Sequence, residues 1–168
     1  GHSLGSLVAI AAAARHPERV RSLALVGVTV PMPVSAYLLE SAEKDEHKAI
    51  EMLNFWGYSK SAQLGGSPTP GHWMLGGGMR LMETARPGVI YTDLHACNEY
   101  IEGLEHAANI RCPALLILGE RDMLTPVRSA HKVVEALPNA EKVVMPGCGH
   151  ALLAEQPDPV LDQLIRVV

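Results

Sequence analysis

A serine between two glycines lies at the start of the chain, where Gly1-His2-Ser3-Leu4-Gly5 follows the pattern G-x-S-x-G. This pattern is typical of a sharp turn between a strand and a helix that exposes the serine hydroxyl. A serine becomes a nucleophile only when it is held next to a base, and the small glycines let the strand and the helix approach each other. The alternative is that Ser3 only caps the helix that follows it.

The base that Ser3 needs is sought among eight histidines. His150 ends the sequence PGCGH directly after an expected strand, and residues in that place project from the carboxyl edge of a parallel sheet. His2 is set aside, because a side chain beside the nucleophile on such a turn is expected to point elsewhere. The other histidines lie at a helix end, within a helix or in the middle of the chain. An alternative for His150 is a loop histidine bonded to the backbone.

The acid that would orient His150 is Asp122, four residues after the expected strand end at Leu118. Glu120 is a weaker candidate, because it lies closer to the strand and would face a neighbouring arginine or solvent. Asp122 also has an alternative role, as an Asx turn before the helix expected at Thr125. The chain order Ser, Asp, His is one of three orders in which such catalytic triads occur.

Strands and helices alternate on both sides of the middle of the chain, a pattern typical of an α/β fold with a parallel sheet and crossover helices. Aliphatic runs predict the strands, and an alanine-rich run and Thr-Pro and Asp-Pro pairs predict the helices. The expected elements are a helix over 4–15, strands over 21–30, 114–118 and 142–145, and helices that begin at Thr125 and Asp158.

The middle of the chain, residues 31–108, differs from the flanks because it contains all seven aromatic residues and nine of the fifteen glycines. Apolar spacing predicts two long helices here, over 35–55 and 90–108. The glycine-rich segments 65–71 and 76–78 are expected to break the helical pattern.

We therefore expect a helical lid over 31–108, inserted between two parts of one core at 1–30 and 109–168. Aromatic and methionine side chains of the lid would line an apolar substrate site, or would only pack the lid against itself. The candidates are Phe55, Trp56, Trp73, Met74, Met79 and Met82.

Composition excludes several classes of protein. The chain has 168 residues, of which 48% are hydrophobic and 19% charged, and this suits one globular domain rather than a disordered chain. The net charge of −4 is dispersed, so no basic stripe is present to bind nucleic acid, and no apolar run is long enough to span a membrane. Three cysteines without a C-x-x-C pair argue against disulfides or zinc and indicate a reducing, cytoplasmic location. Nucleotide-binding and metal-binding motifs are missing too, so no cofactor is expected.

The sequence resembles the α/β-hydrolase superfamily in four segments, GHSLG at 1–5, SLALVG at 22–27, LLILGERDMLTP at 115–126 and GCGHALLAEQPD at 147–158. Within this superfamily it resembles the lidded serine esterases of the pimeloyl-carrier-protein methyl ester esterase-like type. The resemblance implies an α/β-hydrolase fold with a truncated parallel sheet and a helical lid. It assigns the nucleophile to Ser3, the acid to Asp122, the base to His150 and one oxyanion N–H to Leu4.

Two comparisons within that superfamily matter for function. Haloalkane dehalogenases and epoxide hydrolases of this fold carry a carboxylate where this sequence has Ser3, which argues against both. The superfamily also has an upstream half, with a loop that donates the second oxyanion N–H, and this half has no counterpart in the sequence. We therefore expect residues 1–168 alone to be inactive.

Together, the three residues and the resemblance predict a serine hydrolase that cleaves a carboxylic ester of a hydrophobic small molecule through an acyl-enzyme. Hydrolysis of a C–C bond or a thioester, or a cofactor-free peroxidation, would use the same residues and is left open. A non-catalytic binding protein, or an inactive fragment, is a further alternative. The expected partner is the ester substrate, with no nucleic acid and no membrane, and the oligomeric state is left open.

Overall fold

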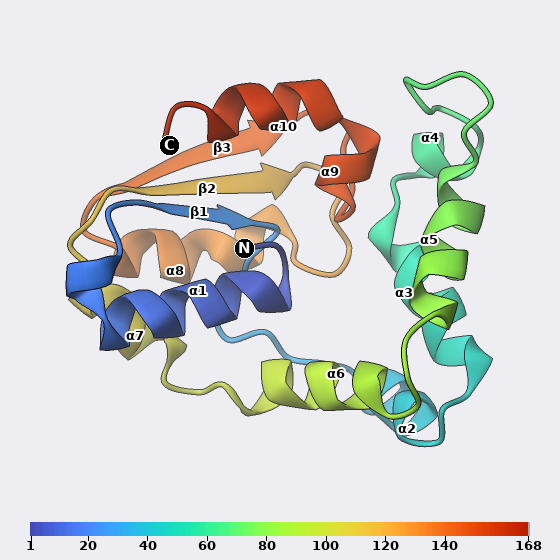
Figure 1. Ribbon diagram of the computed structural model, residues 1–168, viewed down its shortest axis with the longest axis horizontal. Coiled ribbons are helices and arrows are strands. Elements are labelled where there is room, and N and C mark those ends of the chain that lie inside the picture. Colours follow the sequence, from blue (N-terminus) through green and yellow to red (C-terminus); the bar gives the residue numbers. More distant parts are fainter. Residues whose placement is uncertain (168) are drawn as a thin grey trace.

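Three parallel strands form the sheet of the structure (Figure 1). In this computed structural model, which describes residues 1–167, the strands lie in the order β1 (Leu23–Val26), β2 (Ala114–Gly119) and β3 (Ala140–Met145). All six residues of β2 are buried, as expected for a central parallel strand that is covered on both faces. The three expected strands are therefore present. Val168, the last residue of the expected 109–168 core segment, lies outside the described residues.

The strand β1 is shorter than the apolar run over 21–30. It ends because Gly27 has a φ of +56°, which turns the chain away from the sheet after Gly27 N–H has bonded to Ile117 O over 2.9 Å. Val28 and Val30 beyond this turn are still buried, with exposed fractions of 0% and 1%. Most of this run is therefore apolar because it is buried from Leu25 to Val30, although only Leu23–Val26 pair as a strand.

Helices cover both faces of the sheet (Figure 1). One face carries α1 (Leu4–Arg15), α7 (Gly103–Asn109) and α8 (His131–Ala136), and the other carries α9 (Leu152–Glu155) and α10 (Pro157–Leu164). Because side chains alternate along a strand, Leu116 and Leu118 of β2 pack into the first core, whereas Leu115 and Ile117 pack into the second.

Two short 3-10 helices, η1 (Pro17–Arg19) and η2 (Val127–Ala130), connect these elements. The helix expected at Thr125 therefore begins as the 3-10 helix η2 and continues as α8.

The middle region, residues 31–108, forms a separate layer as far as α6, whereas its last residues, from Gly103, begin α7 on a face of the sheet. Its helices from α2 to α6 lie beyond the arrowheads of the strands, at the carboxyl end of the sheet (Figure 1). A cluster of buried side chains around Leu38, Ala42 and Ala49 holds α2, α3 and α6 together. The middle region thus has a small hydrophobic core of its own. The bounds of these helices are α2 (Ala36–Glu43), α3 (His47–Gly57), α4 (Lys60–Gln63), α5 (Met74–Glu83) and α6 (Val89–Glu99).

Both long helices expected in the middle region are divided in the structure. The run over 35–55 becomes α2 and α3, because Asp45 adopts a left-handed φ of +51° between them. The run over 90–108 becomes α6 and α7, because the chain turns at Tyr100, whose hydroxyl lies 2.7 Å from His106 Nδ1. After this division, α6 packs on the middle region through Ile90 and Leu94 and on the sheet core through Cys97, and α7 packs on the sheet core.

The expectation that residues 76–78 break the helical pattern is wrong, because all three glycines lie inside α5. A Cβ added at Gly76 would lie 2.2 Å from the ring of Trp73, and one added at Gly78 would lie 2.5 Å from Asn54 Oδ1. These two glycines therefore serve close packing around α5. The segment 65–71, by contrast, does separate α4 from α5.

Two neighbouring substitutions in α5 test this packing. Gly78→Ala should lower the free energy of unfolding by about 1–3 kcal/mol through overpacking against Asn54. Gly77 is exposed, and its added Cβ would lie 3.4 Å from the nearest atom, His72 Nε2. Gly77→Ala should therefore raise the free energy of unfolding by up to about 1 kcal/mol, from helix propensity alone. Urea unfolding measures both variants, and changes of the same sign would contradict the packing role.

Candidate active site

Ser3 lies at the turn between the first residues of the chain and α1. His2 forms a parallel bridge with Val26 of β1, and Ser3 N–H donates to Val26 O over 2.9 Å. The backbone of Ser3 has φ 52° and ψ −121°, and such a conformation costs a non-glycine residue about 1–3 kcal/mol. The hydroxyl of Ser3 caps no helix N–H within residues 1–167, so the helix-cap alternative does not describe it.

A second serine and one glycine hold this turn. Ser6 Oγ donates to Gly1 O over 2.8 Å and lies 3.1 Å from Val26 O. A Cβ added at Gly1 would lie only 2.0 Å from Gly5 O, so the close approach requires glycine at this position. A Cβ added at Gly5 would meet no described atom within 4 Å. The expected steric reason for glycine therefore applies to Gly1 but not to Gly5.

Asp122 follows β2 and its side chain is fully buried. Its Oδ1 accepts hydrogen bonds from the backbone N–H groups of Leu124 and Thr125 over 2.8 and 2.7 Å. Its Oδ2 accepts from Thr125 Oγ1 over 2.7 Å and from His150 Nδ1 over 2.8 Å. Asp122 therefore forms the Asx turn and also holds His150, so the two roles weighed from the sequence occur together.

These hydrogen bonds decide the charge of Asp122. Burial alone would raise the pKa of this carboxyl, but the hydrogen bonds and charge of His150 and the hydrogen bonds of Thr125 outweigh burial and lower the pKa. Asp122 is consequently a carboxylate at neutral pH, and it can only accept hydrogen bonds. His150 Nδ1 must therefore carry the proton in their shared bond, which leaves Nε2 of the neutral imidazole with a lone pair to accept a proton.

His150 lies on the turn after β3, and its side chain is 8% exposed. One side of its ring packs against backbone, since a Cβ added at Gly27 would lie 3.1 Å from both Cε1 and Nδ1. Ser3 N–H bonds to Val26 O, and Gly27, the next residue after Val26, packs on the ring of His150. The same strand end therefore positions the candidate nucleophile and the candidate base. Among the described residues, Ser3 Oγ and His150 Nε2 form no hydrogen bond, a contact that often tightens only when substrate binds.

His2, which sequence reasoning set aside, contacts the candidate base directly. Its Nε2 lies 2.8 Å from His150 O, and the centroids of the two rings are 4.7 Å apart. Burial, followed by the charge of His150, lowers the pKa of His2 to about 4. His2 is therefore neutral at pH 7 and donates from Nε2 to the carbonyl of His150. The sequence carried no signal for this contact beyond the position of His2 next to Ser3.

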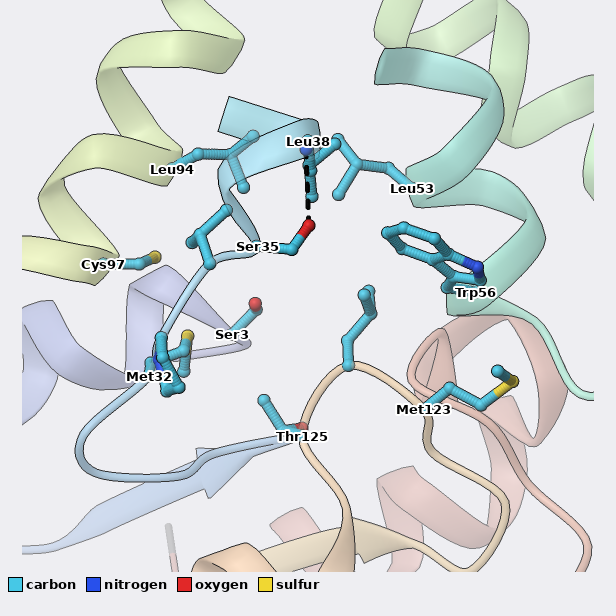
Figure 2. A pocket seen from close by; sticks show the side chains of 13 residues that line it. Ser3, Met32, Ser35, Leu38, Leu53, Trp56, Leu94, Cys97, Met123 and Thr125 are labelled. Carbon is cyan, nitrogen blue, oxygen red and sulfur yellow. Dashed lines mark hydrogen bonds between the residues drawn. The ribbon is translucent and has the colours of Figure 1, made fainter. Parts of the chain in front are cut away.

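A cavity of about 220 Å³ opens above Ser3, between the sheet and the middle region. Figure 2 shows Leu94 and Cys97 on one side of Ser3, and Leu53, Trp56 and Met123 on the other. Most of its lining is apolar, and the hydroxyl of Ser3 points into it. The full lining is Ser3, Met32, Pro33, Val34, Ser35, Leu38, Leu53, Trp56, Leu94, Cys97, Met123, Leu124 and Thr125.

The structure separates the six candidate residues of the expected lid. Trp56 lines the cavity at Ser3, whereas the other five do not belong to its lining. Phe55 and Trp73 are exposed, at 58% and 65%, and Met74 is buried at 2%. Met79 lines a different hollow, and the remaining candidate, Met82, accepts a hydrogen bond at its sulfur from Asn54 Nδ2 over 3.4 Å.

Leu4, the candidate oxyanion donor, is the first residue of α1. Backbone N–H groups in the first turn of a helix have no partner within the helix, and the helix dipole favours negative charge there. The position of Leu4, directly after Ser3, suits an N–H that faces a developing oxyanion.

Other kinds of site can be surveyed across the described part of the chain. No group of three or more His, Cys, Asp or Glu side chains there is arranged to hold a metal ion. No helix among residues 1–167 is long and apolar enough to cross a bilayer. Cys97, Cys112 and Cys148 are all free thiols.

Comparisons with known proteins agree with the observed fold. The defining pattern of the Alpha/beta hydrolase family matches residues 1–163. A pimeloyl-[acyl-carrier protein] methyl ester esterase of Chromobacterium violaceum is 30% identical over 161 residues, which cover 90% of this chain and 61% of that protein. A solved structure described as a thermophilic esterase is 28% identical, with a TM-score of 0.81, and the match covers 99% of this chain and 63% of that one.

A further solved structure extends the comparison of folds. The esterase EaEST from Exiguobacterium antarcticum has a TM-score of 0.82 at 16% identity, and the match covers 99% of this chain and 64% of that one. This similarity concerns the fold alone. The chain spans less than two thirds of the length of each of these relatives.

The lowered pKa of Asp122 leads to a test of the site. A carboxyl with a lowered folded pKa stabilises the folded state above its unfolded pKa of about 3.9, and this contribution is lost as pH falls through the folded pKa. Thr125→Val removes the hydroxyl that donates to Asp122 Oδ2. It should cost about 1.5–3 kcal/mol of unfolding free energy at pH 7, and the deficit should shrink below about pH 4. Urea unfolding at several pH values measures this, with the exposed Thr69→Val as the control; a pH-independent deficit would count against the prediction.

Proposed function

The chain belongs to the alpha/beta hydrolase family, and from this premise we propose that it is a serine hydrolase that cleaves carboxylic esters through an acyl-enzyme. The observation that carries the proposal is the buried bond between Asp122 and His150 Nδ1, which leaves Nε2 as a base. Ser3 supports it, because its strained backbone directs an uncapped hydroxyl into the adjoining cavity.

The proposed reaction begins with attack of Ser3 Oγ on the carbonyl carbon of the ester. His150 Nε2 accepts the proton of the hydroxyl, and the carboxylate of Asp122 stabilises the imidazolium that results. The carbonyl oxygen becomes an oxyanion near the N–H of Leu4. When the intermediate collapses, the ester C–O bond breaks and Nε2 returns the proton to the departing alcohol.

The second half of the reaction clears the acyl group from Ser3. A water molecule gives a proton to His150 Nε2 as it attacks the acyl carbon. Collapse of this second intermediate breaks the bond to Ser3 Oγ, which takes the proton back from Nε2. The products are a carboxylic acid and the regenerated serine.

Two relatives favour an ester as the substrate class. The relatives at 30% and 28% identity are described as a methyl ester esterase and as a thermophilic esterase. C–C bond cleavage, thioester hydrolysis and peroxidation would use the same three side chains, but no feature of the described site favours one of them. A role in binding alone would leave the backbone strain at Ser3 without a purpose.

We also propose that residues 31–108 act as a lid over this site. Helices α2 to α6 of this region lie at the carboxyl end of the sheet, α2 and α3 have a hydrophobic cluster of their own, and the region supplies most of the apolar cavity wall. An apolar wall of this kind suits a hydrophobic acyl or alcohol group. The activity is a proposal for the whole protein, because the chain spans 61% of the curated esterase relative.

Substitution of the nucleophile tests the reaction. In the whole protein, Ser3→Ala should reduce hydrolysis of short p-nitrophenyl esters by several orders of magnitude without unfolding the chain. A fluorophosphonate probe should label Ser3, identified by mass spectrometry of the labelled peptide, and should not label the Ser3→Ala variant. Ser129→Ala, at an exposed serine, is the control. Turnover by Ser3→Ala close to that of the unmodified protein would refute the proposal.

The apolar cavity predicts a dependence on chain length. Each methylene that enters the cavity should add about 0.8 kcal/mol, or about fourfold in kcat/KM, until the cavity is full. Steady-state kinetics with p-nitrophenyl esters from acetate to octanoate measures this. Trp56→Ala should move the optimum to longer chains, whereas Phe55→Ala, at the neighbouring residue outside the cavity lining, should not. A flat profile, or equal effects of the two variants, would contradict the assignment.

A further inference from the structure

The proposed reaction has no use for one buried carboxylate near the site. Glu155, the last residue of α9, is 8% exposed. Its Oε1 accepts hydrogen bonds from the backbone N–H groups of Gly149 and Ser59, over 3.1 and 3.2 Å. Among the described residues no Lys, Arg or His forms an ion pair with it. Burying a carboxylate costs free energy unless hydrogen bonds satisfy its oxygens. The two backbone bonds of Glu155 offset part of that cost, and the role of Glu155 therefore has to be sought in what these bonds hold.

These bonds belong to a group of hydrogen bonds that holds the backbone of three consecutive residues, 149–151, in place. Gly149 N–H donates to Glu155, and His150 O accepts from His2 Nε2 over 2.8 Å. Ala151 N–H donates to Gly57 O over 2.9 Å. The turn that carries His150 is therefore held by α9, by the turn at Ser3 and by the middle region at once.

The contact with the middle region is close enough to require a glycine. A Cβ added at Gly149 would lie 2.6 Å from Ser59 N, 2.7 Å from Glu155 Oε1 and 3.0 Å from Gly57 O. Gly57 ends α3 and Ser59 caps α4, so the segment between these two helices rests directly on the His150 turn. Its neighbour in the chain, Trp56, lines the cavity above Ser3 (Figure 2).

We propose that Glu155 is a positioning residue that clamps the segment Gly57–Ser59 onto the turn of His150, and so couples occupancy of the cavity at Trp56 to the placement of the catalytic base. The proposal rests on the proposed function, in which His150 is that base. A substrate chain that packs against Trp56 fixes the position of the adjoining segment Gly57–Ser59. Glu155 Oε1 accepts hydrogen bonds from both Ser59 and Gly149, so the position of this segment determines that of Gly149. Because catalysis needs its groups within about 0.5 Å of the productive geometry, a small shift of this turn affects the chemical step.

The chemistry of the clamp determines which substitutions distinguish it. Both partners of Glu155 are N–H donors, so an oxygen acceptor in the same place is what the clamp requires. Glu155→Gln keeps such an oxygen and loses the charge. Glu155→Asp keeps the charge but withdraws the oxygens by one methylene. Glu120→Ala is the matched control, because Glu120 also accepts from a backbone N–H of this turn, that of Gly147 over 2.8 Å, but is exposed and, among residues 1–167, forms no hydrogen bond or ion pair with the middle region.

The experiment measures kcat and KM of the whole protein on a short and a medium-chain p-nitrophenyl ester, and amide hydrogen exchange at Gly149 and Ser59. In Glu155→Asp and Glu155→Ala, kcat should fall by up to about 100-fold, with little change in KM, and both amides should exchange faster. The coupling predicts that the longer ester has a higher kcat than the short ester in the unmodified protein. This difference should disappear in Glu155→Asp and Glu155→Ala, which a merely structural role would not predict. Glu155→Gln should retain most of kcat, and Glu120→Ala should change neither readout.

Each outcome decides the proposal. Unchanged kcat or unchanged exchange in Glu155→Asp would overturn it, as would a Glu155→Gln variant that is as impaired as Glu155→Asp. If Glu155→Ala does not fold, the Gln and Asp variants still decide. Amide exchange reports the clamp without catalysis, so a failure of the esterase proposal, seen as full activity in Ser3→Ala, is distinguishable from a failure of the clamp.

Discussion

The bond between Asp122 and His150 is the contact on which the arrangement of the site depends, and the sheet is built to make it possible. The register of the parallel strands places Gly119 opposite Met145, so the loops that carry the acid and the base leave the sheet at the same level. A Cβ at Gly119 would lie 2.1 Å from Gly149 O, so these loops can cross only at a glycine. Backbone bonds from the acid loop to the base loop, such as Arg121 N–H to Cys148 O over 2.8 Å, then hold the two loops together.

The conformation of Ser3, the proposed nucleophile, depends on a balance between its backbone strain and the hydrogen bonds that hold it. A positive φ is unfavourable for a serine by itself. The turn persists because Val26 O accepts from Ser3 N–H and because Ser6 Oγ lies within hydrogen-bond distance of both Gly1 O and Val26 O. The strain is thus compensated by β1, the same strand whose continuation at Gly27 packs on the ring of His150. The proposed nucleophile and base are positioned by one strand end, although Ser3 and His150 lie 147 positions apart in the sequence.

The sequence allowed the α/β-hydrolase fold and its three strands to be predicted, and the comparisons confirm that fold. The G-x-S-x-G pattern pointed to Ser3, and strand ends placed Asp122 and His150 as candidates, because parallel strands bring their carboxyl ends together whatever lies between them. Contacts between distant side chains were missed, as with His2 and Glu155, since neither periodicity nor composition reports which backbone group a side chain reaches. In the middle region, glycine content predicted helix breaks, whereas in α5 the glycines serve packing against Trp73 and Asn54, which only the tertiary structure reveals.

The division of the hydrophobic cores bears on how the proposed triad could stay fixed while the proposed substrate site varies. The buried side chains form three clusters, and the cavity residues Leu53 and Leu94 pack against the cluster in the middle region rather than against the two around β2. A wholly independent middle region would, however, give the triad no way to respond to what the cavity holds. The segment Gly57–Ser59 supplies that connection through backbone bonds, which remain available whatever side chains line the cavity. Selectivity and catalysis can thus be tuned separately while staying physically linked.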